Sequence, residues 1–80
     1  MRILDQTNDK SLSDILLLLT IDEAKELRDA IETLLLQQNK NDHCHISDFD
    51  YSKELTVSLY EQNQIDGFNE RIQMLINKDI

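Results

Sequence analysis

The residues best suited to chemistry in this sequence are two histidines, His43 and His45, which stand two positions apart. In a β-strand, residues i and i+2 project from the same face about 7 Å apart, so both imidazoles can reach one metal ion. A complete site needs three or four ligands, and Asp42, Asp48 or Glu54 could supply a carboxylate. Because the spacing requires none of them, the sequence favours two surface histidines, with a ligand or metal sensor as an alternative.

The other groups that could support catalysis are poorly arranged for it. Cys44 is the single cysteine, so no disulfide can form within the chain, and a lone cysteine is typical of a reducing compartment. Strand alternation would turn Cys44 away from both histidines and leave its thiol without a base. No pair of carboxylates is marked as acid and base, and Gly67, the single glycine, forms no phosphate loop. We therefore expect a cytoplasmic protein that is not an enzyme, with no catalytic residue, no cofactor and no resident metal.

The charge of the chain predicts its partners. Sixteen acidic residues against eight basic ones give a net charge of −8, and the basic residues are spread along the whole chain. Such a surface repels a phosphate backbone, so we expect no direct binding to nucleic acid, and a basic protein as the partner. The alternative is that the acidity serves solubility alone. The longest apolar run, residues 15–19, is far shorter than the roughly 20 residues of a membrane span.

The clearest predicted element is a helix that begins after Thr20 and ends near Gln38. Thr20 and Glu23 form a capping box, in which each side chain satisfies a backbone N–H of the first turn. An apolar stripe follows at spacings of three and four residues, and polar residues occupy the opposite face. After a turn cluster, residues 43–48 and 53–60 alternate apolar and polar side chains, which predicts an antiparallel hairpin of two half-buried strands.

The remaining segments are predicted less directly. Residues 2–6 form a candidate strand and residues 7–11 a polar turn. Residues 15–19 are uniformly apolar, which suits a buried central strand, although a helix starting at Ser11 is the alternative. A last helix carries apolar residues at helical spacing, with Asn63 or Asp66 as its N-cap.

The element order strand, strand, helix, strand, strand, helix predicts an α+β fold. We expect a two-layer sandwich in which a four-stranded, mostly antiparallel sheet carries both helices on one face, and residues 1–80 form one compact domain. The expected single core comprises Leu27, Ile31, Leu34, Leu55, Val57, Leu59, Phe68 and Ile72.

Two surfaces are candidates for binding. If the apolar side chains of the hairpin face the helices, the opposite face presents polar and aromatic residues that suit protein contacts. These are His43, His45, Thr56, Ser58 and Tyr60, with Tyr60 as the expected anchor. The second surface is the acidic side of the first helix, represented by Glu26 and Asp29. A homodimer through the sheet face or a strand edge is also expected, because so short a chain has a modest core.

These observations predict a small acidic protein-binding module. The expected type is a stand-alone inhibitor, immunity protein, antitoxin or phage anti-defence protein that occludes a basic surface of its partner. The alternatives are a homo-oligomeric structural or accessory subunit, and a sensor that uses His43 and His45.

Overall fold

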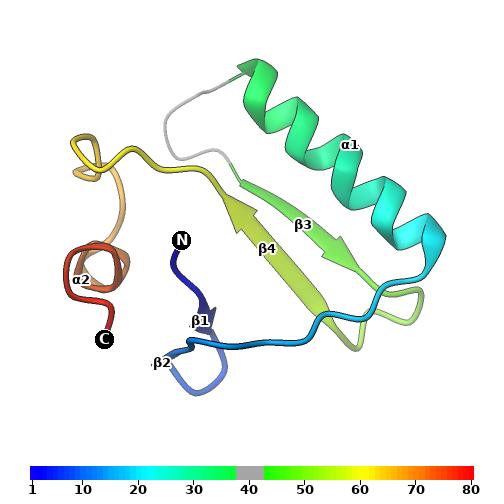
Figure 1. Cartoon of the computed structure of the whole chain (residues 1–80), viewed down its shortest axis with the longest axis horizontal. Helices are drawn as coiled ribbons and strands as arrows, with labels where there is room; N and C mark the ends of the chain where they lie inside the picture. The colour runs from blue at the N-terminus through cyan, green and yellow to red at the C-terminus, as the bar shows by residue number, and fades with distance from the viewer. Residues whose placement is uncertain (38–42) are drawn as a thin grey trace. The chain divides into compact units, whose positions relative to one another are not determined.

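The computed structural model describes residues 1–37 and 43–80 of the chain (Figure 1). Its elements follow the predicted order, two strands, a helix, two strands and a helix, and the α+β class is confirmed. The four strands, however, form two separate antiparallel pairs, not one four-stranded sheet. The chain divides into two compact units, of which unit 1 comprises Met1–Leu17 and Glu61–Ile80, and unit 2 comprises Leu18–Tyr60.

Unit 2 begins with helix α1, Ile21–Gln37, and the capping box predicted from the sequence is present. The backbone N–H of Glu23 donates to Thr20 Oγ1 at 3.1 Å, and the N–H of Thr20 donates to Glu23 Oε1 at 2.9 Å. Both bonds satisfy amides that have no partner inside the helix. The helix therefore starts where the capping box predicts. Its predicted end, Gln38, lies outside the described residues.

The hairpin of unit 2 consists of strands β3, His43–Ser47, and β4, Glu54–Ser58, which pair antiparallel. Helix α1 lies alongside β3 and runs in the opposite direction, as Figure 1 shows. Leu34 of α1 and Ile46 of β3 are only 4% and 5% exposed and form the core of this layer pair. Burying such aliphatic side chains is the main source of stability in so small a unit.

Unit 1 combines the two ends of the chain. Strands β1, Leu4–Asp5, and β2, Lys10–Ser11, are joined by a turn in which the Asp5 carboxylate accepts hydrogen bonds from Asn8 and Thr7. These bonds, those of Asn8 first, lower the pKa of Asp5 below its ordinary value of 3.8. The turn thus stabilises a strand pair that is only two residues long on each side.

Helix α2, Glu70–Lys78, supplies the buried part of unit 1 through Leu75 and Ile76. Its N-cap is Asn69, whose side chain accepts from the N–H of Ile72, so the predicted caps Asn63 and Asp66 are wrong. At the other end, Arg2 donates to the carbonyls of Leu75 and Ile76 at 3.0 to 3.2 Å. A cation beside the last carbonyls of a helix satisfies them and complements the helix dipole.

Residues 15–19 were expected to form a buried strand or part of a helix, and they form neither. Among the described residues they pair with no strand, and Leu16 and Leu18 are 82% and 81% exposed. The second strand of the chain is instead β2, in the segment predicted as a turn. A short apolar run becomes a central strand only when neighbouring strands pair with it on both sides.

The predicted single core is also divided. Leu34 is buried, while Leu27, Ile31, Leu55 and Val57 are half-buried in unit 2. Phe68 and Ile72 belong to unit 1, and Leu59 lies beyond the end of β4 with 38% of its surface exposed. The assignment of residues 1–80 to one domain stays a prediction.

Candidate protein-binding surface

The polar face of the hairpin brings four of the predicted binding residues together. The register pairs His43 with Ser58 and His45 with Thr56, while Cys44 and Ile46 pair with apolar residues of β4. Because strand side chains alternate, these two polar pairs share one face and the apolar pairs the other. His43, His45 and Ser58 are exposed and Thr56 is half-buried, so an accessible polar surface exists here as predicted.

His45 is held in a fixed orientation on this face. Its Nδ1 lies 2.6 Å from Glu54 Oε1 and 2.9 Å from Thr56 Oγ1. Since a carboxylate can only accept, the proton of this contact belongs to His45 Nδ1. The ring also makes an edge-to-face contact with His43, with centroids 4.8 Å apart. Alternation places Glu54 on the same face as Thr56 and Ser58, so its carboxylate belongs to this polar face.

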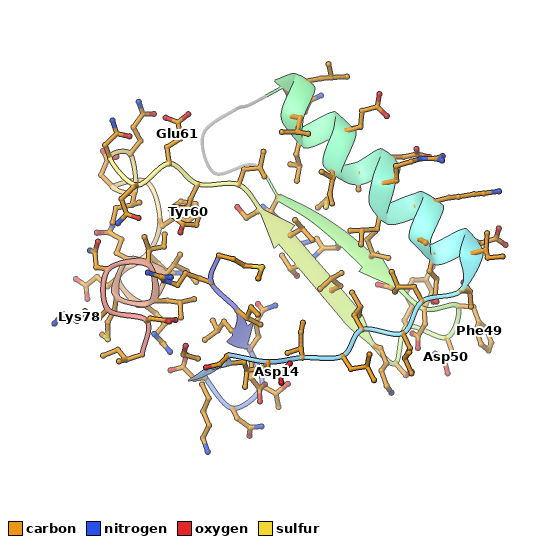
Figure 2. All side chains as sticks on the ribbon, viewed as in Figure 1. Asp14, Phe49, Asp50, Tyr60, Glu61 and Lys78 are labelled. Carbon is orange, nitrogen blue, oxygen red and sulfur yellow. The ribbon has the colours of Figure 1, made fainter. Side chains whose placement is uncertain are left out.

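Tyr60 does not extend this surface as expected. Strand β4 ends at Ser58, so the alternation that would aim Tyr60 from the polar face stops two residues before it. Tyr60 is half-buried and lies on the connection that follows the strand, next to Glu61 (Figure 2). Its role as the anchor of the sheet face stays a prediction.

Glu26 and Asp29 lie on the exposed side of α1, as expected. Arg28 Nε donates to Asp29 Oδ1 at 3.0 Å, and both side chains are 65% exposed. An ion pair this exposed contributes little to stability, but it offsets part of the negative charge of Asp29. Glu26 is thus the stronger acidic feature of this surface.

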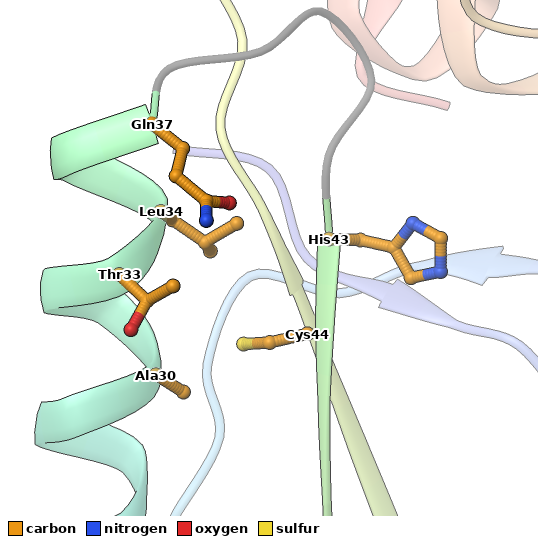
Figure 3. Close-up of a pocket in the computed structure, with 6 residues that line it drawn as sticks. All are labelled: Ala30, Thr33, Leu34, Gln37, His43 and Cys44. Carbon is orange, nitrogen blue, oxygen red and sulfur yellow. The ribbon is translucent and has the colours of Figure 1, made fainter.

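An open hollow of about 310 Å³ lies between α1 and the start of β3. Figure 3 shows the Cys44 side chain directed toward the helix and the His43 ring directed away from it. Cys44 is half-buried and faces Leu34, which agrees with its predicted position on the apolar side. The hollow is lined by Ala30, Thr33, Leu34, Gln37, His43 and Cys44.

The described residues offer no group of three His, Cys, Asp or Glu side chains arranged to hold a metal ion. Glu54 contacts His45, yet the pair lacks a third ligand within this part of the chain. Asp42, which the sequence suggested as a helper ligand, lies outside the described residues. The structure thus adds no support to the alternative of a metal sensor.

The loop between β3 and β4 carries two exposed aromatic residues that belong to neither of the predicted binding surfaces. Phe49 is 96% exposed and Tyr51 is 83% exposed. The sequence carries a signal for this surface, because two aromatic residues stand among otherwise polar loop residues. A turn requires no aromatic side chain, so these two are available for contacts. They form a second potential contact surface on the same hairpin.

Asp48 organises this loop. Its carboxylate accepts from the backbone N–H of Lys53 at 3.0 Å and from the hydroxyl of Ser52 at 2.9 Å. The Asp50 carboxylate accepts from the N–H of Ser52 at 3.2 Å. The bond from Lys53, followed by those from Ser52 and a contact with Asp50, lowers the pKa of Asp48 below 3.8, so the side chain is charged at neutral pH.

The hairpin and α1 thus present acidic, polar and aromatic side chains on one compact unit. Among the described residues no helix is long and apolar enough to cross a membrane. Comparison with protein families, with curated proteins and with solved structures finds no match for this chain, so its function has to be argued from its own surface.

Proposed function

We propose that this chain is a protein-binding module that occludes a basic surface of a partner protein in the cytoplasm. The observation that carries the proposal is the extent of apolar surface left exposed on a small acidic chain. Among the described residues, six large apolar side chains are at least 77% exposed beyond the N-terminal Met1, namely Leu16, Leu18, Ile21, Leu36, Phe49 and Tyr51. Large apolar side chains left exposed in this number on a small acidic chain favour a protein contact site.

The net charge of −8 supports a basic partner. An acidic surface accelerates association with a basic one and disfavours acidic competitors. A stand-alone inhibitor, immunity protein, antitoxin or anti-defence protein fits this combination of small size and single-sign charge. The polar face of the hairpin, with His43 and His45 beside Thr56 and Ser58, would supply specificity through hydrogen bonds.

The test begins with capture of the partner from the native host on the immobilised chain, followed by measurement of association with the purified partner. The captured protein should be basic, and its association rate should fall steeply with added salt, since charges are screened beyond about 8 Å at physiological ionic strength. An acidic partner, or an association rate that salt does not change, would overturn the proposal.

Variants separate the two predicted surfaces. We expect His45→Ala to weaken the complex more than Glu26→Lys combined with Asp29→Lys. The proposal assigns the partner to the polar face that carries the fixed His45 ring, and α1 lies on the opposite side of the hairpin (Figure 3). Tyr60→Ala serves as a comparison, since Tyr60 is half-buried beyond the strand. The reverse order of His45→Ala and the double variant would assign binding to the helix.

A homo-oligomeric accessory subunit is the second candidate, because a second copy could also cover the exposed apolar side chains. Two copies would each bring a charge of −8, which opposes their association. Light scattering at high micromolar concentration decides the matter: a stable dimer favours the accessory subunit, and a monomer removes it.

A further inference from the structure

One end of unit 2 gathers apolar side chains that its core does not use. Four of them are almost fully exposed, at 81% for Leu18, 77% for Ile21, 96% for Phe49 and 83% for Tyr51. All four belong to the same compact unit. We call this group the hairpin end.

The topology of unit 2 brings these residues to one place. Helix α1 and strand β3 run in opposite directions side by side, so the start of the helix and the loop after β3 lie at the same end (Figure 1). Figure 2 shows Phe49 and Asp50 on that loop, near the beginning of α1. The start of α1 and the loop after β3, about thirty positions apart in sequence, therefore lie at the same end of unit 2 (Figure 1).

The loop is fixed before any partner arrives. The N–H of Tyr51 donates to the carbonyl of Asp48 at 3.0 Å, and the Asp48 carboxylate bonds Ser52 and Lys53 across the loop. Tyr51 has φ of 58°, a left-handed conformation that disfavours a bulky residue and persists only where neighbours enforce it. Aromatic side chains on a fixed loop lose little conformational entropy on binding.

The charge around the apolar side chains selects the partner. Three acidic residues lie at this end: Asp22 in the first turn of α1, and Asp48 and Asp50 in the loop. Lys53 is the one basic residue of the loop. Such a rim complements lysine and arginine and opposes anionic lipid or nucleic acid.

From these observations we propose that the hairpin end docks in an apolar pocket with a basic rim on the partner protein, with Phe49 and Tyr51 as the anchors. This inference rests on the proposed function and names the part of the chain that makes the tightest contact. Buried aromatic residues dominate the affinity of protein interfaces, whereas the polar residues around them set orientation.

The experiment compares Phe49→Ser combined with Tyr51→Ser against Leu36→Ser, using the purified basic protein that the wild-type chain captures. Leu36 is a matched control, because it is 81% exposed on the same unit but lies near the other end of α1. We expect the double variant to bind at least about 30-fold more weakly, which corresponds to a hot spot of about 2 kcal/mol, and Leu36→Ser to bind as the wild type does. Unchanged circular dichroism melting curves would show that all variants fold.

Asp50→Asn tests the basic rim, because the amide keeps an oxygen for the N–H of Ser52 and removes the charge. It should slow association and reduce its dependence on salt. An unchanged association rate for Asp50→Asn would overturn the basic rim.

The remaining outcomes either show which of the two proposals fails or assign the hairpin end to another occupant. If the double variant binds the partner as tightly as the wild type, the docking inference is overturned while the proposed function stands. If the wild type captures no basic protein, the proposed function itself fails. Cosedimentation of the wild type, but not the double variant, with phosphatidylcholine–phosphatidylglycerol vesicles would assign the hairpin end to a membrane and overturn the inference. A wild-type dimer that the double variant abolishes would assign it to a second copy, with the same consequence.

Discussion

At the scale of single residues, short-range hydrogen bonds fix the side chains that matter most in the hairpin. His45 lies between Glu54 and Thr56, and Asp48 bonds two residues of the loop. These contacts join residues that are four to eleven positions apart. Alternation along the strands predicted the face of His45, but the partner of each side chain depends on the cross-strand register, which only the folded hairpin defines.

The lowered pKa of Asp48 makes the stability of the hairpin depend on pH. Because the folded state holds the ionised carboxylate, its pKa lies below the ordinary value of 3.8, and the stabilisation is complete above about pH 4. It is lost as the pH falls through the folded-state value. The difference in unfolding free energy between wild type and Asp48→Asn should therefore be larger at neutral pH than near about pH 3, as measured by urea denaturation.

Asp14→Asn is the control for this experiment, since Asp14 is exposed and lies outside the hairpin loop. It should not reproduce the change with pH. An identical difference for Asp48→Asn at both pH values would contradict the assignment of the charged bond to the folded loop.

Removal of the capping hydroxyl should destabilise α1. Thr20→Ala deletes the acceptor for the N–H of Glu23, and the expected cost is about 1 kcal/mol of unfolding free energy. Thr33→Ala is the matched control, because its hydroxyl donates to the carbonyl of Asp29 inside the helix and its loss is expected to be close to neutral. Equal effects of the two substitutions would show that the capping box does not stabilise the helix.

At the scale of elements, prediction succeeded where the signal was local. The capping box marked the start of α1, and alternation marked both strands of the hairpin to within two residues at each end. It failed for residues 15–19, because an apolar run without periodicity becomes a strand only through pairing elsewhere in the chain. It also failed for the start of α2, where Asn69 was passed over for caps closer to the preceding strand. The exposed aromatics of the loop were missed because turn rules describe backbone shape, not what the side chains contact.

The packing of α1 on β3 gives a prediction at this scale. Leu34→Ala removes a side chain that is 4% exposed and should lower the stability of unit 2 by about 2–5 kcal/mol. Leu36→Ala, on the same helix, should change it by less than about 0.5 kcal/mol because Leu36 is exposed. Amide hydrogen exchange of α1 reports the difference within this unit, and similar exchange rates in the two variants would contradict the assigned core.

At the scale of the whole molecule, the net charge determines which macromolecules can approach. Eight excess negative charges on an 80-residue chain oppose every polyanion. Charge could be read from composition without any structure, whereas the division into two units could not, because it depends on which segments pair over long separations.

The consequence for nucleic acid is testable directly. We expect no complex of the free protein with DNA or RNA in a gel-shift assay at physiological salt, because phosphate binding depends on lysine and arginine. A complex of micromolar or tighter affinity would show that the basic residues cluster on one surface despite the negative net charge.

The discontinuous make-up of unit 1 has a consequence for biosynthesis. Residues 18–60 are contiguous, so unit 2 can collapse as soon as this stretch has left the ribosome. Arg2, by contrast, cannot reach the carbonyls of Leu75 and Ile76 until the final helix has been translated. Met1–Leu17 therefore cannot complete its unit until Glu61–Ile80 has been made, and a chain truncated after Tyr60 should hold the folded hairpin while β1–β2 lacks the helix that completes its unit.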